Sequence, residues 1–220
     1  MNTLSFRPIR PLLAALSVLT LAGALQGCAP AVIGGAVVGG LVYSDRRTSG
    51  AQLEDEGIEL RGAARVREAL GGRGHINITS YNRQVLVTGE VPTQNDKITV
   101  EQVLSRVENV RGVINELGVM DNTTLAQRSA DALITTKVKA AFVDAKDVQA
   151  NAFKVVTERG TVYLLGRVTR AEAERATELA RTVQDVKRVV RSLEIISDQE
   201  LRQLQGQPAP ASTVSPRPAS

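Results

Sequence analysis

The chain has 220 residues, with 27 basic and 23 acidic side chains, no tryptophan, and aromatic residues at only 3% of positions. A chain whose charges are this nearly balanced is not expected to bind nucleic acids. Its few aromatic side chains provide no stacking platforms for bases or sugars. One cysteine and one histidine are too few for a thiol- and imidazole-based metal site or a catalytic triad.

The first 27 residues have the pattern of a signal peptide. Arg7 and Arg10, with no acidic residue, precede an apolar run from Leu12 to Ala22, and the segment leads into Leu25-Gln26-Gly27-Cys28. The run is shorter than the roughly 20 apolar residues that cross a bilayer, so a transmembrane anchor with an incidental cysteine is the less favoured alternative. Removing residues 1–27 leaves 25 basic and 23 acidic side chains, a net charge of +2.

The end of this segment resembles the lipobox of bacterial lipoproteins, in which the cysteine thiol is diacylated and the peptide is cut before it. By this resemblance Cys28, the only cysteine, carries the lipid. Ala29 in place of aspartate implies sorting to the outer membrane, where the chain is lipid-anchored on the periplasmic face. Acyl chains contribute roughly 0.8 kcal/mol per buried CH₂, so several of them hold the protein almost permanently.

The segments at the two ends of the mature chain have low-complexity composition. Residues 28–52 are predicted to form a lipidated, glycine-rich tether. The segment from Ala29 to Tyr43 consists mostly of small apolar residues and glycines. It is too short to span a bilayer, and its glycines make a stable helix unfavourable. Residues 198–220 predict a disordered tail, since four prolines lie beyond Gln205 without apolar periodicity.

An eight-residue strand pattern occurs twice, 77 positions apart. Gln84–Val91 reads QVLVTGEV and Thr161–Val168 reads TVYLLGRV. In both, apolar residues alternate and a glycine, Gly89 or Gly166, stands third from the end. The alternation predicts a strand with one buried face, and the repetition predicts a duplicated domain.

Other segments around each strand keep the same phase. In the first copy we expect a helix at Leu60–Leu70, a first hairpin strand at Ile76–Ser80, a second helix at Val100–Val107 and a last strand at Val113–Leu117. In the second copy the same elements are expected at Leu133–Phe142, Phe153–Thr157, Ala176–Val183 and Val189–Leu193. The loop after the first helix is expected to be about five residues longer in the second copy, from the positions of these two helices.

The order of elements defines the fold class. Short turns make the first two strands antiparallel, and a right-handed crossover makes the strands flanking the second helix parallel. Only one face of each sheet is apolar, so both helices must cover that face. We predict an α+β fold of two tandem αββαβ units, each with a three-stranded mixed sheet and two helices packed on one face. Units this small bury a limited core, so we expect the two repeats to pack together.

These units resemble BON domains, named for bacterial osmotic-stress and nodulation proteins. The resemblance rests on the duplicated strands and on VRGVIN at 110–115 and VKRVVR at 186–191. It extends to dual-BON outer-membrane lipoproteins and implies a first BON domain at 53–120 and a second at 124–197. It also implies association with anionic phospholipid at division sites and support of outer-membrane integrity.

Charge distinguishes the two repeats. From Leu53 to Gly118 there are 8 basic and 10 acidic residues, net −2, and from Ser129 to Ser197 there are 12 and 9, net +3. When the first helices of the two repeats are aligned at an offset of 72 residues, charged residues of repeat one match this part of repeat two. Arg61 then matches Leu133, Arg65 matches Lys137, and Glu68 matches Ala140. Apolar residues beside a lysine suit a lipid surface. We expect the lipid-binding face to comprise Leu133, Ile134, Lys137, Lys139 and Ala140.

The sequence predicts neither an enzyme nor a cofactor or metal site. His75 has no second histidine or thiol as a partner, and the glycines at 71–74 follow a helix and lack the lysine of a P-loop. Glu172 and Glu174 open a helix, where acidic residues complement the dipole.

Three function classes remain. The first is an outer-membrane lipoprotein whose second BON domain binds anionic phospholipid, phosphatidylglycerol in particular. The second is an envelope adaptor that docks on the outer-membrane assembly machinery or on amidase activators. The third is a periplasmic stress or structural factor with no specific ligand.

Overall fold

The computed structural model describes residues 45–205, which belong to one compact unit. The predicted signal peptide, Cys28 and most of the predicted tether lie outside the described residues. Within residues 45–205, no helix combines the length and hydrophobicity needed to cross a bilayer.

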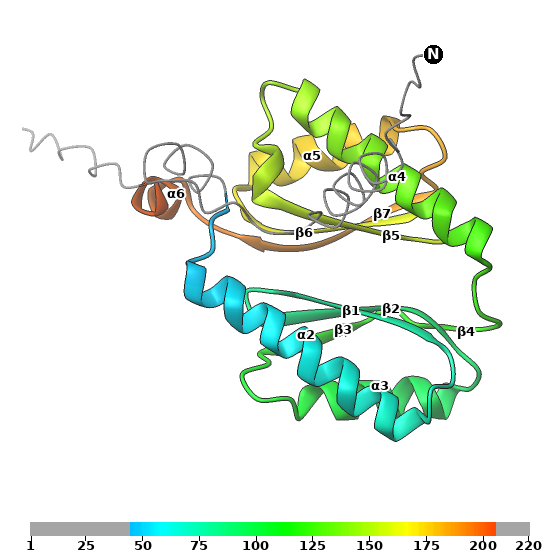
Figure 1. Ribbon diagram of the computed structural model, residues 1–220. Coiled ribbons are helices and arrows are strands. Elements are labelled where there is room, and N and C mark those ends of the chain that lie inside the picture. Colours follow the sequence, from blue (N-terminus) through cyan, green and yellow to red (C-terminus); the bar gives the residue numbers. More distant parts are fainter. Residues whose placement is uncertain (1–44, 206–220) are drawn as a thin grey trace, which may run out of the picture. The chain divides into compact units, whose positions relative to one another are not determined.

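Repeat one contains two helices on one face of a mixed sheet (Figure 1). Its elements are α2 (Ser49–Leu70), β1 (His75–Tyr81), β2 (Gln84–Val91), α3 (Gln94–Ser105), β3 (Gly112–Asn115) and β4 (Gly118–Val119). The hairpin β1–β2 is antiparallel, and β3 and β4 both pair with β2 in parallel. The third strand predicted from the sequence is therefore present but interrupted between β3 and β4.

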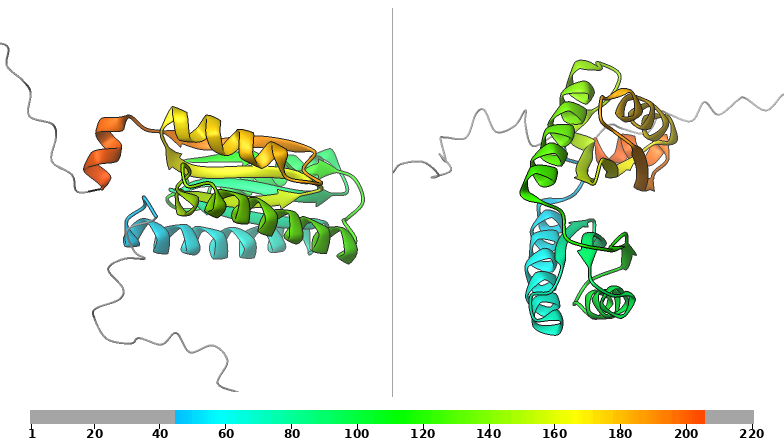
Figure 2. Two further views of the ribbon diagram at one scale, coloured as in Figure 1. Left: turned by 90° about the horizontal axis from the view of Figure 1, so that it is seen from above. Right: turned by 90° about the vertical axis from the view of Figure 1, so that its right-hand side faces the viewer.

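Repeat two has the same order of elements. They are α4 (Leu125–Asp144), a 3₁₀ turn η4 (Ala150–Ala152), β5 (Phe153–Glu158), β6 (Thr161–Val168), α5 (Arg170–Thr182), β7 (Arg188–Ile195) and α6 (Asp198–Leu204). The sheet order is β5-β6-β7, with an antiparallel hairpin and a parallel third strand. Figure 2 shows α4 as a long continuous helix beside the shorter α5. The predicted αββαβ fold is confirmed in both repeats.

The duplicated glycines occupy equivalent positions, as the sequence predicted. Gly89 pairs with Ile76 and Gly166 pairs with Phe153, 77 residues further on. A Cβ at position 89 would lie 1.9 Å from the carbonyl oxygen of His75, and one at position 166 would lie 2.4 Å from that of Ala152. Both hairpins therefore need glycine because a neighbouring backbone approaches too closely for any side chain.

Some predicted boundaries were wrong. Helix α2 begins at Ser49 rather than Leu60, so it includes the end of the segment predicted as a tether. Its first turn is stabilised by Thr48, whose hydroxyl accepts a hydrogen bond from the N–H of Ala51. The predicted disordered tail begins with helix α6, which Ser197 caps in the same way through the N–H of Glu200. Residues 206–220 lie outside the described part of the chain.

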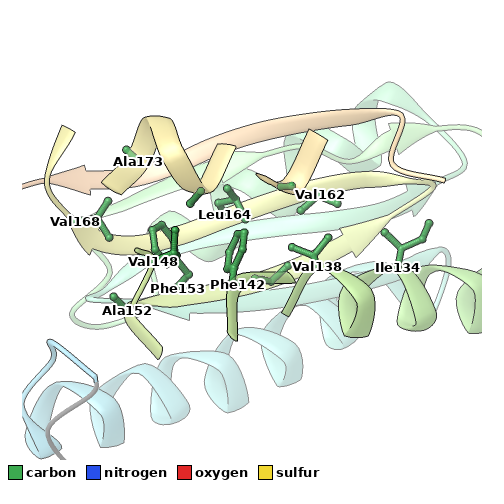
Figure 3. Close-up of a cluster of buried hydrophobic side chains, with 13 residues drawn as sticks. Ile134, Val138, Phe142, Val148, Ala152, Phe153, Val162, Leu164, Val168 and Ala173 are labelled. Carbon is green, nitrogen blue, oxygen red and sulfur yellow. The ribbon is translucent and has the colours of Figure 1, made fainter. Parts of the chain in front are cut away.

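Apolar side chains fill the space between helices and sheet in each repeat. In repeat two, Ile134 and Val138 point from α4 toward the strands, and the rings of Phe142 and Phe153 lie 5.4 Å apart (Figure 3). Repeat one has a corresponding cluster around Ile58. Each repeat therefore has a core of its own.

A third apolar cluster joins the repeats through the sheet faces that carry no helices. Leu86 and Tyr81 of repeat one pack with Tyr163 and Leu165 of repeat two. Polar contacts surround this cluster: Lys154 pairs with Glu59 at 2.8 Å, and other cross-repeat bonds join Arg159 to Glu90, Arg188 to Glu116, and Asn82 to Glu194. The expectation that the repeats pack together is confirmed.

The residues just before α2 contact repeat two. Arg46 is 7% exposed, and its guanidinium donates two hydrogen bonds to Glu172, at 2.6 and 2.8 Å, and one to the carbonyl of Arg167 at 2.8 Å. Arg47 pairs with Asp55 at 2.7 Å and lies over the ring of Tyr81. These two arginines connect the start of repeat one to the side of repeat two.

Candidate functional site

One buried aspartate in each repeat fixes how the first helices correspond. Asp55 of α2 accepts hydrogen bonds from the backbone N–H groups of Asn82 and Arg83, at 2.8 and 2.7 Å. Asp131 of α4 accepts bonds from Arg159 and Gly160, both at 2.8 Å. Each aspartate therefore anchors the hairpin turn of its own repeat, and the two helices align at an offset of 76.

The alignment at an offset of 72 was therefore wrong. At 76, the buried residues Ile58 and Ile134 also coincide. Leu133 then corresponds to Gly57, Ala140 to Ala64, and Lys137 to Arg61. The idea that repeat one replaces these apolar positions with charges therefore fails. The loop after the first helix is longer in the second copy, as expected: four residues, 71–74, follow α2, and eight residues, 145–152, separate α4 from β5.

Four of the five predicted lipid-facing residues are exposed on α4. Leu133, Lys137, Lys139 and Ala140 all lie outside the core, and Leu133 is 63% exposed. Ile134 was assigned wrongly, since it is 5% exposed and belongs to the core of repeat two. A residue one position along a helix turns by about 100°, which carries Ile134 from the outer face to the sheet.

The structure adds two apolar residues that the sequence reasoning missed. Leu125 is 75% exposed and Val143 is 70% exposed. With about 100° of turn per residue, they fall with Leu133 and Ala140 inside an arc of about 80°. We call these four residues the α4 stripe. It was missed because the predicted helix ran only from Leu133 to Phe142, whereas α4 extends from Leu125 to Asp144.

The early start of α4 has a local cause. Thr124 and Gln127 form a capping box, in which the threonine hydroxyl accepts from the N–H of Gln127 and the glutamine side chain accepts from the N–H of Thr124. This arrangement satisfies N–H groups that the first turn leaves free. The Thr-x-x-Gln sequence was the signal that could have located the helix start.

Basic side chains border the α4 stripe on both sides. Lys137 lies next to Leu133, and Arg128 and Lys139 lie on the opposite border by helical geometry. Lys137 pairs with Asp185 at 3.1 Å, but both side chains are about half exposed, so this contact is weak. Helix α4 has three basic and two acidic residues, and one of the acids, Asp131, is buried against the hairpin turn.

Helix α2 also exposes leucines, but its charge is of the opposite sign. Leu53 and Leu60 are 71% and 74% exposed. The helix carries three basic and five acidic residues, net −2, whereas α4 has a net charge of +1. Exposed apolar residues therefore occur on both first helices, and only those of α4 lie in surroundings that attract an anionic surface.

Next to α4, titratable side chains meet between the repeats. Glu90 accepts a hydrogen bond from Arg159 at 2.6 Å and another from the N–H of Thr123 at 3.0 Å. Burial alone would raise the pKa of Glu90, but these bonds outweigh it and hold the pKa below its usual range. Burial raises the pKa of Glu158, which a hydrogen bond from Asn77 only partly offsets. His75 lies beside both glutamates.

The family model of the BON domain matches residues 61–121 and 130–197, once in each repeat. The chain belongs to the BON-domain family. The chain is also 41% identical over 170 residues to the outer membrane lipoprotein DolP of Haemophilus influenzae, covering 76% of this chain and 88% of that protein. This BON-domain protein is therefore a member of the dual-BON outer-membrane lipoproteins, as its sequence predicted.

Two other proteins resemble this BON-domain protein at greater distance. The 21 kDa hemolysin of Actinobacillus pleuropneumoniae is 32% identical over 154 residues, which cover 69% of this chain and 79% of the hemolysin. A solved structure of the C-terminal domain of CdsD, a structural protein of the Type III secretion system of Chlamydia trachomatis, covers 61% of this chain and 96% of its own, with 9% identity and a TM-score of 0.27.

Proposed function

We propose that this protein is anchored by lipid on Cys28 to the periplasmic face of the outer membrane, where its second BON domain binds anionic phospholipid through the α4 stripe. This contact supports outer-membrane integrity and favours sites rich in anionic lipid, such as the division site. The role is one of binding rather than catalysis. The observation that carries the proposal is the exposed apolar stripe of α4 between basic side chains.

The energies of such a contact are modest and additive. Leu125, Leu133 and Val143 are 63–75% exposed, so inserting each side chain among acyl chains contributes on the order of 1–2 kcal/mol. Each nearby basic residue adds about 1 kcal/mol on an anionic surface. A contact with this small free energy is enough for a domain that its acyl chains already hold at the membrane, because the tether keeps α4 at a high effective concentration near the lipid.

Liposome flotation tests the proposal. The soluble fragment should begin at Asp45, since Arg46 and Arg47 are held in contacts with the folded domains. We expect flotation with vesicles containing phosphatidylglycerol and none with neutral vesicles. Leu133→Glu should abolish flotation without changing the thermal midpoint, and Lys137→Glu should weaken it more at low than at high ionic strength.

Two control variants separate the lipid face from other effects. Leu60→Glu changes an equally exposed leucine of α2 and should float like the wild type. Ile134→Glu changes the neighbouring core residue and should unfold repeat two. If Leu133→Glu floats as well as the wild type at an unchanged thermal midpoint, α4 is not the lipid face.

The exposed leucines of α2 favour a second candidate function. Leu53 and Leu60 lie on an acidic helix that an anionic membrane repels, so they suit an envelope protein with a basic, apolar groove. The outer-membrane assembly machinery and amidase activators are candidates for this adaptor role. Loss of a cross-linked envelope partner in Leu60→Glu, with lipid binding retained, would support it.

A further inference from the structure

Three metal-ligating side chains meet where the two sheets face each other. His75 and Glu90 are directly paired across the β1–β2 hairpin, and Glu158 ends β5 in the other repeat. Each offers a ligand atom, and these atoms all lie within 4.8 Å of one another. The Nδ1 of His75 and the Oε2 of Glu90 are 3.4 Å apart.

These distances fit a tetrahedral ion. With bonds of about 2.1 Å to nitrogen and oxygen, two ligand atoms around Zn²⁺ lie about 3.4 Å apart. The His75–Glu90 pair already has this spacing, and a small movement of the Glu158 side chain would complete three ligands. Two of the three are on adjacent hydrogen-bonded strands, so the backbone holds them in place.

Neighbouring groups orient the ligands without occupying all their capacity. Arg159 donates to Oε1 of Glu90, and Thr123 donates to Oε2 through both its N–H and, at 3.2 Å, its hydroxyl. The hydroxyl also lies 3.4 Å from Nδ1 of His75, and its rotation would free lone pairs on both ligand atoms. Such outer contacts are typical of groups that hold a ligating carboxylate in position. Asn77 donates to Oε2 of Glu158 at 2.9 Å, and no other hydrogen bond to this carboxylate is present within the described residues.

Charge also favours a cation here. Glu90 is 0% exposed and Glu158 is 7% exposed. Arg159 pairs with Glu90, but among residues 45–205 no lysine or arginine forms an ion pair with Glu158, whose hydrogen-bond donor is a neutral amide. A buried carboxylate without a cation is costly, and a divalent ion bound here would supply Glu158 with the positive charge that Arg159 already gives to Glu90.

We propose that His75, Glu90 and Glu158 bind one divalent cation of the zinc type, which links the two BON domains. A pocket of about 440 Å³, whose lining includes His75, Glu158 and, among the other residues, Asp131 and the basic Arg128, gives the ion a path from solvent and leaves its fourth position to water. One imidazole and two carboxylates select Zn²⁺ and similar transition metals over Mg²⁺, which prefers oxygen ligands alone. The sequence did not indicate this site, because its ligands come from three strands and two of them are glutamates.

Calorimetric titration of the full chain in detergent tests the proposal. The protein should be untagged, so that His75 is its only histidine, and should carry Cys28→Ser, which removes the only thiol. We expect one Zn²⁺ per chain, a much weaker response to Mg²⁺, and a thermal midpoint that rises by roughly 5 °C at a saturating Zn²⁺ concentration.

Three variants make the test specific. Glu158→Gln and His75→Gln should each lower Zn²⁺ affinity at least about tenfold and remove the rise in thermal midpoint. Glu116→Gln should keep both, because Glu116 lies at the same interface, beside Arg188 and Tyr163, outside the ligand set. His75 is partly exposed, so His75→Gln decides the question if Glu158→Gln does not fold. Absence of one-to-one binding, or equal affinity in wild type and both ligand variants, would overturn the proposal.

Discussion

Asp55 holds four partners at once, and removing its carboxylate should be among the most damaging single changes in repeat one. Besides the N–H groups of Asn82 and Arg83, it accepts hydrogen bonds from the hydroxyl of Ser80 at 2.6 Å and from Arg47 at 2.7 Å. Asn82 and Arg83 both have positive φ, at 49° and 65°. A positive φ is common for asparagine but unfavourable for arginine, so this turn gains from the hydrogen bonds to the carboxylate.

The cost of Asp55→Ala can be worked out from these contacts. Each donor left without an acceptor costs about 1–3 kcal/mol when buried, and turn N–H groups recover part of this from water. We expect a loss of about 3–5 kcal/mol, the range for breaking a buried charged pair. In a protein of this size, this corresponds to a thermal midpoint lower by about 10 °C.

The effect should depend on pH in a defined direction. Burial by itself would raise the pKa of Asp55, but hydrogen bonds from Ser80, Arg83 and Arg47 outweigh it, and the pKa is lower than the usual 3.8. A carboxyl group with a lowered pKa in the folded state contributes stability above its unfolded pKa, and the contribution disappears as pH falls through the folded pKa. The difference between wild type and Asp55→Asn should therefore be full at pH 7 and shrink below about pH 4.

Thermal unfolding followed by circular dichroism measures both effects. Glu56→Ala, at an exposed neighbouring position of α2, is the matched control and should melt within about 2 °C of the wild type. If the thermal midpoint of Asp55→Ala equals that of Glu56→Ala, the backbone alone holds the turn and the role assigned to the carboxylate is wrong. A difference that stays constant from pH 7 to pH 3 would contradict the pKa argument.

Two further predictions concern packing and the N-terminal contact. Gly166→Ala should cost about 2–4 kcal/mol in urea unfolding, because its Cβ would overlap the carbonyl of Ala152; Gly112→Ala, where no atom lies within 4 Å, should cost less than about 1 kcal/mol. Arg46→Ala should release the segment before α2, so that trypsin cuts after Arg47 several times faster than in the wild type while α2 stays folded. An unchanged cutting rate would show that the contact with Glu172 does not hold this segment.

The αββαβ order and the two glycines could be predicted from the sequence. The alternation of apolar residues is a local signal, and the same pattern recurs 77 residues later. The extent of the first helices could not be predicted as well. The first buried position of each helix is an aspartate, Asp55 or Asp131, and these look like surface acids until the hairpin turns that they bind are placed beside them. The error in the offset followed from this, since the aligned segments covered only the C-terminal half of each helix.

The candidate lipid face was found in part for a similar reason. Leu133, Lys137 and Ala140 could be placed on one face from helical periodicity alone, but the assignment of Ile134 ignored the sharp change between adjacent helix positions. The cluster of His75, Glu90 and Glu158 depends on the packing of two sheets, which no local pattern in the sequence encodes.

The hydrogen bonds of Arg46 also have a consequence for the order of folding. They join positions separated by 121 and 126 residues, so they cannot form until the second domain has left the ribosome or the translocation channel as far as Glu172. Repeat one has a complete core of its own and can fold before that moment. Docking of Arg46 is therefore a late event, and a chain truncated before Glu172 would expose the segment before α2 to proteases.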